Sequence, residues 1–209
     1  TLWNTYAFFV LYANIDEFDA TKYTLEYDKL SVMDKWLLSK LNTLVKTVDD
    51  NLANYKITET ARVLDNFVDE LSNWYVRRSR ARFWVKEMTQ DKINAYMTLY
   101  TALVTLCKAA APMIPFMTED IYQNLVRNID KSAPESIHLC DFPEYDEKLN
   151  FPKDVESMEL IMQSISAIRN RRAEMNVPPS KKAKVIIVTD KTDVFKQGTA
   201  FFEKLASAS

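Results

Sequence analysis

Residues 72–84 read Ser-Asn-Trp-Tyr-Val-Arg-Arg-Ser-Arg-Ala-Arg-Phe-Trp, with four arginines and four aromatic residues in thirteen positions. This stretch continues a pattern of apolar residues three and four positions apart, which is typical of one buried helix face. The apolar residues of that face are Leu64, Phe67, Val68, Leu71, Trp74 and Tyr75. At ~100° per residue, Arg78 and Arg82 continue the same stripe. We expect both to be partly buried and paired with carboxylates of neighbouring helices, because an unpaired buried charge is strongly destabilising.

The opposite side of this predicted helix carries Asn73, Arg77, Arg80 and Trp84, at positions i, i+4, i+7 and i+11. Guanidinium groups pair with phosphate, and exposed indole rings stack on nucleobases. The sequence therefore predicts an RNA-binding face made of these four residues. The alternative interpretation of the same pattern is that the arginines are solvated or paired with acids and that the tryptophan lies in the core.

A second basic cluster lies between residues 169 and 184, where six positive charges accompany one negative charge. The predicted contacts to an RNA backbone are Arg169, Arg171, Arg172 and Lys181. Such contacts would not depend on RNA sequence. The alternative is a helix C-terminus that carries the cations its dipole favours.

The composition favours helices over sheets. The chain of 209 residues is 47% hydrophobic and contains a single glycine, whereas tight hairpins need glycine at their turns. The net charge of −2 predicts no general affinity for polyanions, so any nucleic-acid contact must come from local patches. Two cysteines, no signal peptide and no long apolar run favour a cytoplasmic protein that does not span a membrane.

We predict an all-α fold, an antiparallel helix bundle. Helices are expected at residues 2–15, 31–54, 58–86, 90–110, 118–128 and 153–175, with Ser31, Thr58 and Thr118 at their starts. The short apolar run at residues 183–188 predicts a strand, which would open a mixed region that continues beyond the chain. We accordingly predict two domains. Residues 1–150 would form the bundle, and residues 151–209 would hold a further helix with the arginine cluster and the start of the truncated C-terminal region.

Catalytic chemistry is not expected in this chain. A single glycine excludes a glycine-rich phosphate loop, and a single histidine, His138, excludes a two-histidine zinc motif. The sequence also shows no catalytic motif in which a nucleophilic residue is paired with a general base. The prediction is therefore no catalytic residue, no metal site and no cofactor within these residues.

The pattern Asn73-Trp74-Tyr75-x-Arg77-Arg78-Ser79-Arg80-x-Arg82-Phe83-Trp84 resembles the anticodon-binding domain of the isoleucyl-tRNA synthetase family. Segments at 2–5, 111–122, 136–143 and 169–180 resemble further parts of that domain in the same order. The resemblance covers nearly the whole chain. The proline-containing segment at 111–122 is also similar to valyl and leucyl enzymes, which remain an alternative. A helical protein-interaction module without an RNA role is a second alternative.

The resemblance implies a larger enzyme whose active site lies upstream of this chain. That enzyme would use ATP and Mg²⁺ to charge tRNA(Ile) with isoleucine, and we expect it to be monomeric. This chain would hold the anticodon stem and loop, so that the acceptor end reaches the active site.

The lack of a nucleotide-binding motif generates a first test. The purified 209-residue chain, supplied with ATP, isoleucine and labelled pyrophosphate, should show no ATP–pyrophosphate exchange above a protein-free blank. Exchange that co-purifies with the chain would reveal an active site that the sequence pattern does not indicate.

Overall fold

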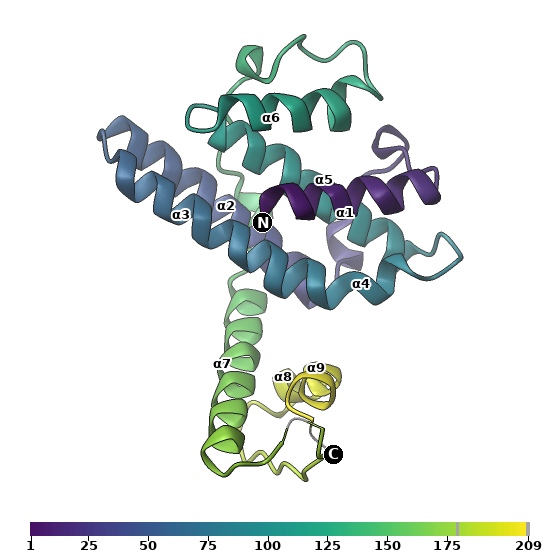
Figure 1. The fold of residues 1–209 in the computed structure, drawn as a ribbon, viewed down its shortest axis with the longest axis vertical. Coiled ribbons are helices and arrows are strands. Elements are labelled where there is room, and N and C mark those ends of the chain that lie inside the picture. The colour runs from purple at the N-terminus through teal and green to yellow at the C-terminus, as the bar shows by residue number, and fades with distance from the viewer. Residues whose placement is uncertain (179, 208–209) are drawn as a thin grey trace. The chain divides into compact units, whose positions relative to one another are not determined.

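The computed structural model describes residues 1–178 and 180–207 (Figure 1). The longer helices are α1 (Leu2–Ile15), α2 (Val32–Ala53), α3 (Ile57–Glu70), α4 (Arg77–Phe83), α5 (Gln90–Ala110), α6 (Pro115–Tyr122), α7 (Pro152–Glu174), α8 (Thr192–Gln197) and α9 (Thr199–Leu205). Two π-helical segments are η3 (Leu71–Val76) and η4 (Gln123–Arg127). Short 3₁₀ turns are η1 (Ala20–Lys22), η2 (Tyr27–Lys29), η5 (Ile137–Leu139) and η6 (Glu147–Leu149). The predicted all-α class is confirmed, and the chain divides into two compact units, Thr1–Phe151 and Pro152–Ser209.

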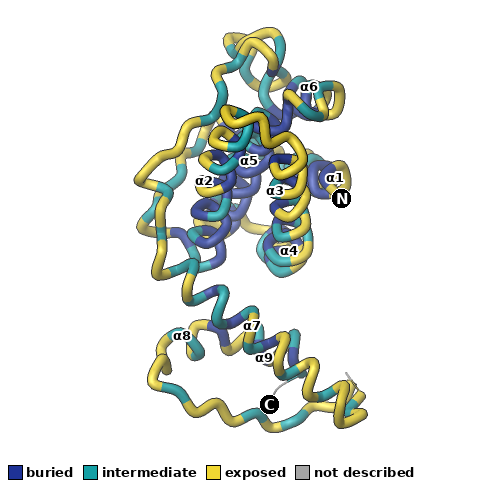
Figure 2. The backbone as a smooth tube through the Cα atoms, turned by 90° about the vertical axis from the view of Figure 1, so that its left-hand side faces the viewer, coloured by how far each residue is buried: buried dark blue, intermediate teal, exposed yellow. Residues whose placement is uncertain are grey.

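Helix α5 lies at the centre of the first unit. Helices α1, α2, α4 and α6 all pack on it, and Figure 2 shows the buried backbone concentrated along α2 and α5. Its Leu99, Leu103 and Leu106 are fully buried, as are Leu37 and Leu38 of α2. Helices α2 and α3 form an antiparallel hairpin across a short turn at residues 54–56. The bundle core is thus built from apolar residues on the sides of α2 and α5 that pack against each other.

A capping box begins α2, as predicted for Ser31. The Ser31 Oγ accepts from the backbone N–H of Asp34 at 3.2 Å, and the Ser31 N–H donates to the Asp34 carboxylate at 3.0 Å. This exchange satisfies two backbone donors that the helix itself leaves free. It also fixes the Asp34 carboxylate at the buried start of α2.

A charged network around Asp34 joins α2, α4 and α5. Arg82 donates from both terminal nitrogens to the Asp34 carboxylate, at 2.7 and 2.8 Å, and also binds Asp91 of α5 at 2.8 and 2.9 Å. Tyr75 Oη donates to Asp34 at 2.6 Å. Asp34 has no exposed surface. Burial favours a raised pKa for this carboxyl, but the hydrogen bonds and charge of Arg82 outweigh burial and hold the pKa below its usual value.

The long arginine helix is unbroken from Ile57 to Phe83, as predicted, but it contains the π turn η3 and is therefore not a regular α-helix throughout. A π turn accommodates one extra residue, so the buried stripe advances by one position. After η3 the fully buried positions are Ser79 and Phe83, and Arg78 and Arg82 lie beside them, half-buried. The predicted partial burial of both arginines is therefore confirmed. The helix ends at Phe83, three residues earlier than predicted.

Two predicted helix starts are wrong. The third helix begins at Ile57 without a side-chain cap, so Thr58 already lies inside it. Helix α6 begins at Pro115, three residues before Thr118. Proline is favoured in the first helical turn because its missing N–H would have no partner there. The Thr118 hydroxyl instead bonds back to the carbonyl of Ile114 at 3.0 Å.

The irregular segment after η4 is attached to α2 by buried polar side chains. Asn42 donates to the Asp146 carbonyl and accepts from the Asp146 N–H, both at 2.9 Å. Ser39 Oγ donates to the Leu149 carbonyl at 2.9 Å and accepts from the Phe151 N–H at 2.7 Å. These bonds give the segment backbone partners that a regular element would supply internally.

The second unit packs α8 and α9 on α7. Ile161 and Ile165 of α7 and Phe202 of α9 form its buried centre. Gly198, the single glycine of the chain, stands where these helices come close. A Cβ atom on it would lie 2.9 Å from the Ile161 side chain.

The predicted strand at residues 183–188 does not form within the described part of the chain. Among the described residues of this run, Ala183 alone makes a bridging bond, from its N–H to the Ser207 carbonyl at 3.0 Å. Ile186 and Val188 are exposed. A run of β-branched residues needs a second strand to satisfy its backbone, and no described segment provides one.

Arg172 closes the turn that follows α7. Its Nη2 donates to the Pro178 carbonyl at 3.1 Å and also to the Lys181 carbonyl. The Pro178 carbonyl also accepts from the Lys181 backbone N–H at 3.1 Å, so the guanidinium adds to the backbone bond of this turn. In the described residues, no helix has the length and apolar character required to cross a membrane.

The Asp34 network predicts a large stability effect for Arg82→Ala. Removing one partner of a buried ion pair costs about 3–5 kcal/mol, so thermal unfolding should shift strongly downward at pH 7. Because the Asp34 pKa is lowered in the folded state, its contribution is complete above the unfolded value of ~3.9 and is lost as pH falls through the folded value. The difference in unfolding temperature between the variant and the unmodified chain should therefore become smaller as the pH drops below ~4. Arg80→Ala, on the exposed side of α4, is the control and should unfold nearly as the unmodified chain does.

The turn after α7 predicts a local effect for Arg172→Ala. Losing the bonds to two carbonyls should cost about 1 kcal/mol of local stability, or roughly fivefold faster amide hydrogen exchange at residues 181–183. Arg169→Ala, on the same helix end, should leave that exchange unchanged. Equal exchange in the two variants would show that the guanidinium does not hold the turn.

Candidate nucleic-acid interface

The four residues predicted for the outward face of the arginine helix are all exposed. Asn73 lies in η3, Arg77 and Arg80 lie in α4, and Trp84 follows α4 directly. The π turn η3 contains Asn73 and precedes the other three residues, yet all four are exposed. The Trp84 side chain is among the larger exposed apolar surfaces, at 59% exposure. We name these four residues the outward face.

Helix α1 contributes to this surface, which the sequence pattern does not indicate. The Arg80 guanidinium lies over the Phe8 ring, 5.8 Å from its centroid. The Trp84 Nε1 donates to the Tyr12 hydroxyl at 2.7 Å. Phe8 and Tyr12 lie one turn apart on α1, with ring centroids 4.9 Å apart. Their i, i+4 spacing is the only sequence signal of this pair, and it does not show which helix they meet.

The end of α4 is fixed from its buried side. Phe83 packs edge-on against Phe8 at 5.2 Å and against Tyr96 of α5 at 4.8 Å. The buried Lys92 donates to the Val85 carbonyl at 2.6 Å and pairs with Asp16 at 2.7 Å. The backbone on both sides of Trp84 is therefore anchored to α5 and to the end of α1.

The arginines of this helix divide into two groups. Arg82 is fully engaged with Asp34 and Asp91, so its fork of donors is used inside the bundle. The Arg78 guanidinium lies over the Trp74 ring, 5.4 Å from the centroid. Arg77 and Arg80 direct their charge to solvent. Of these four arginines, Arg77 and Arg80 are exposed, whereas Arg78 and Arg82 are half-buried.

The second cluster, in the second unit, is less uniform than its sequence indicates. Arg169 and Lys181 are exposed. Arg171 is exposed and pairs with Glu174 at 3.0 Å, a surface ion pair that contributes little. Arg172 is half-buried and holds the turn that carries Lys181. The contact of these residues with RNA stays a prediction.

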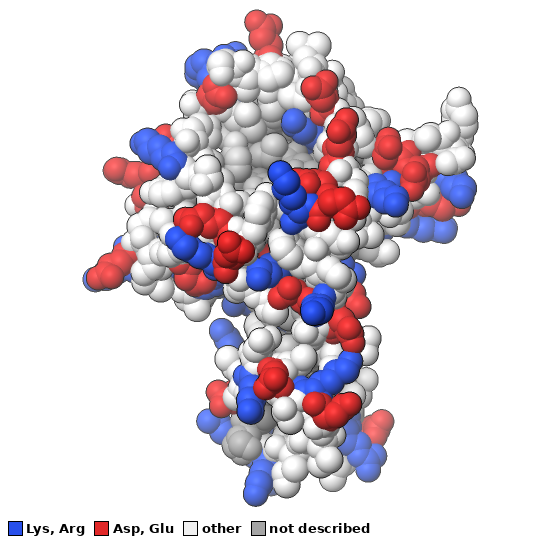
Figure 3. All heavy atoms as spheres, turned by 180° about the vertical axis from the view of Figure 1, so that it is seen from behind, with Lys and Arg blue, Asp and Glu red and all other residues white. Residues whose placement is uncertain are grey.

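Basic and acidic side chains are interspersed over the face of the molecule that Figure 3 shows. This distribution agrees with the small net charge of −2. A surface of mixed sign does not attract a polyanion over long distances. Recognition of RNA would thus have to occur at local sites such as the outward face.

Cys107 is buried, and burial raises the pKa of its thiol to about 12, so the thiol stays protonated at neutral pH. In residues 1–178 and 180–207, no three histidine, cysteine or acidic side chains are grouped so that they could hold a metal ion.

Comparison with known sequences identifies the family. The family described as "Anticodon-binding domain of tRNA ligase" matches residues 34–187. Among the relatives are proteins named isoleucine–tRNA ligase from Clostridium novyi (52% identical over 192 residues) and Clostridium tetani (49% over 193 residues), each aligned with 92% of this chain. The protein of that name from Dehalococcoides mccartyi is 43% identical over 209 residues, 98% of the chain. The chain spans 18% of the length of the two clostridial proteins and 20% of the third. The match at residues 34–187 covers well over half of these 209 residues, so the chain belongs to the anticodon-binding domain family of the tRNA ligases.

Proposed function

We propose that this chain binds the anticodon stem and loop of tRNA(Ile) within an isoleucine–tRNA ligase. The family membership supports tRNA as the ligand. The relatives compared above carry the isoleucine name, which favours isoleucine over valine or leucine. The observation that carries the proposal is the outward face, where two guanidiniums and one indole are exposed on an anchored helix end.

The outward face suits an RNA loop. Arg77 and Arg80 offer charged forks that match phosphate geometry, and the Trp84 indole offers an apolar plane to an unstacked base. The anchoring of Phe83 and Val85 limits movement of these groups before RNA binds. Preorganised contacts of this kind lose less freedom on binding.

Positioning is the contribution that we propose for this chain to aminoacylation. Misplacement of reacting groups by ~1 Å can cost about 10²-fold in rate, so a fixed anticodon contact helps to place the acceptor end. The reaction itself, with ATP, Mg²⁺ and isoleucine, belongs to the part of the ligase outside this chain. We propose a cytoplasmic, monomeric enzyme.

In the second unit we propose that Arg169, Arg171 and Lys181 contact the RNA backbone. Arg172 would support these contacts by holding the turn on which Lys181 stands. Contacts to phosphate fix the orientation of a nucleic acid without reading its sequence.

The test is tRNA binding by the full-length ligase at one fixed salt concentration, because such affinities depend strongly on salt. Trp84→Ala should weaken tRNA(Ile) binding by ~1–3 kcal/mol, and the double variant Arg77→Ala/Arg80→Ala by a similar or smaller amount. Melting temperatures should change little, since these side chains are exposed.

Arg62→Ala is the matched control. Arg62 is also exposed, in α3, roughly 20 Å along the helix from Arg77 at ~1.5 Å per residue. Its replacement should leave tRNA affinity unchanged. Wild-type affinity in both outward-face variants would refute the proposed role of this surface.

A further inference from the structure

The indole of Trp84 has its single hydrogen-bond donor already occupied. Nε1–H is the only polar hydrogen of a tryptophan side chain, and here it donates to Tyr12 Oη at 2.7 Å. Trp84 nevertheless remains 59% exposed. What remains available to a ligand is therefore the face of the ring and not a hydrogen-bonding edge.

Tyr12 is itself held firmly enough to orient its partner. Its ring lies 4.9 Å from the Phe8 centroid and 6.4 Å from the Phe83 centroid. Phe83 is fully buried and precedes Trp84 directly. The hydroxyl that accepts the indole hydrogen bond therefore belongs to a ring that packs among the aromatic side chains between α1, α4 and α5.

The backbone beyond Trp84 has a second, independent anchor. Lys92 is buried and donates to the carbonyl of Val85 at 2.6 Å. With the indole edge bound to Tyr12 and the following peptide bound to Lys92, the ring is constrained at its edge and at its backbone. An exposed tryptophan without such bonds would exchange between rotamers and lose that freedom on binding.

We propose that Tyr12 is a positioning residue that holds Trp84 as a stacking platform for one unpaired nucleobase of any identity. This inference rests on the proposed function and assigns a role to α1, which lies outside the arginine helix. Tolerance of any base follows from the occupied donor, because every base has a π face, whereas a free indole N–H would favour those bases that place an acceptor within its reach. The Arg80 guanidinium, seated on Phe8 beside this platform, is placed for the adjoining phosphate.

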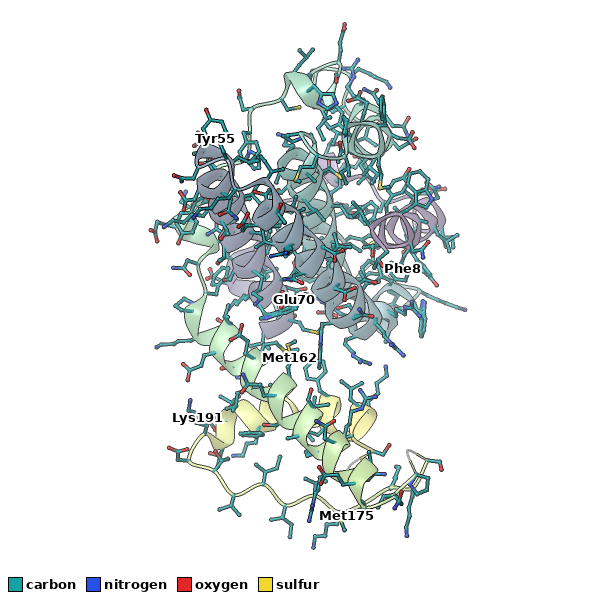
Figure 4. The ribbon with its side chains drawn as sticks, turned by 60° about the vertical axis from the view of Figure 1, so that its left-hand side comes forward. Phe8, Tyr55, Glu70, Met162, Met175 and Lys191 are labelled. Atoms are coloured by element: carbon teal, nitrogen blue, oxygen red, sulfur yellow. The ribbon has the colours of Figure 1, made fainter. Side chains whose placement is uncertain are left out.

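The experiment is a double-mutant cycle on the hydrogen bond, measured as the dissociation constant of the full-length ligase for tRNA(Ile). Tyr12→Phe keeps the ring packing and removes the acceptor, and Trp84→Phe keeps a stacking ring and removes the donor. Each should weaken binding by about three- to tenfold, and the double variant should be no weaker than Trp84→Phe alone. Tyr55→Phe is the control for loss of a hydroxyl. Tyr55 is 89% exposed and stands on the opposite side of the first unit from Phe8 (Figure 4), so its replacement should have no effect.

A second measurement tests whether the group that binds Trp84 is a nucleobase and whether the identity of that base matters. Anticodon stem-loops that carry an abasic nucleotide at each loop position in turn should include one position at which binding falls by about tenfold. Exchanging the base at that position for the other three should change affinity by less than about twofold. With Trp84→Ala, the abasic stem-loop should bind as the intact one does.

The outcomes separate this inference from the proposed function. If Tyr12→Phe weakens binding equally with or without the Trp84 indole, Tyr12 meets RNA directly and does not position Trp84. If Tyr12→Phe has no effect while Trp84→Ala and the Arg77/Arg80 variant weaken binding, the platform needs no positioning residue and only this inference fails. If none of these variants changes tRNA affinity, the proposed function fails as well.

Discussion

The bidentate pair between Arg82 and Asp34 is the interaction on which the arrangement of the bundle depends. The carboxylate has no exposed surface and receives Arg82, Tyr75 and the Ser31 cap together. A buried carboxylate is tolerated only when its lone pairs are satisfied, so the starts of α2 and α5 and the end of α4 must meet at one place. Lysine could not substitute here, because the pair with Asp34 and the further bonds to Asp91 require the planar fork of a guanidinium. Burial, followed by the charge of Asp34, raises the pKa of Tyr75 well above its usual value and keeps its hydroxyl a donor.

Fixing Arg82 inward also decides what the same helix shows to solvent. Side chains on one helix keep fixed angular relations, so an inward Arg82 leaves Arg77, Arg80 and Trp84 facing outward. The π turn η3 adjusts this relation by one residue and seats Phe83, rather than Arg82, in the fully buried position. The arginines of one short segment therefore have two tasks. Arg82 holds three helices together, and Arg77 and Arg80 remain exposed.

The second unit follows the same physical rule on a smaller scale. Arg172 is directed at backbone carbonyls of the turn after α7, while Arg169 and Lys181 remain exposed around it. In both units, an arginine next to the apolar stripe stabilises the fold, Arg82 through carboxylates and Arg172 through backbone carbonyls, and its neighbours present charge to solvent. A guanidinium can do either, because it combines five donors with an apolar stem that packs. Replacing a whole cluster at once would mix the two effects, so single variants are needed to separate stability from binding.

Much of the molecule follows from the sequence alone. The helical spacing of apolar residues gives the helices, the Ser31 cap, the partial burial of Arg78 and Arg82 and the exposure of the four outward residues, because these features depend on neighbours within a few turns. Other features depend on contacts between distant segments. The sequence does not show that Asp34 and Asp91 receive Arg82, that Tyr12 meets Trp84 or that residues 183–188 find no strand to pair with in the described chain, since each needs a partner whose position is set by packing. The π turn and the start of α3 at Ile57 instead of a Thr58 cap were likewise decided by tertiary structure, because core packing outweighs local helix preferences of about 1 kcal/mol.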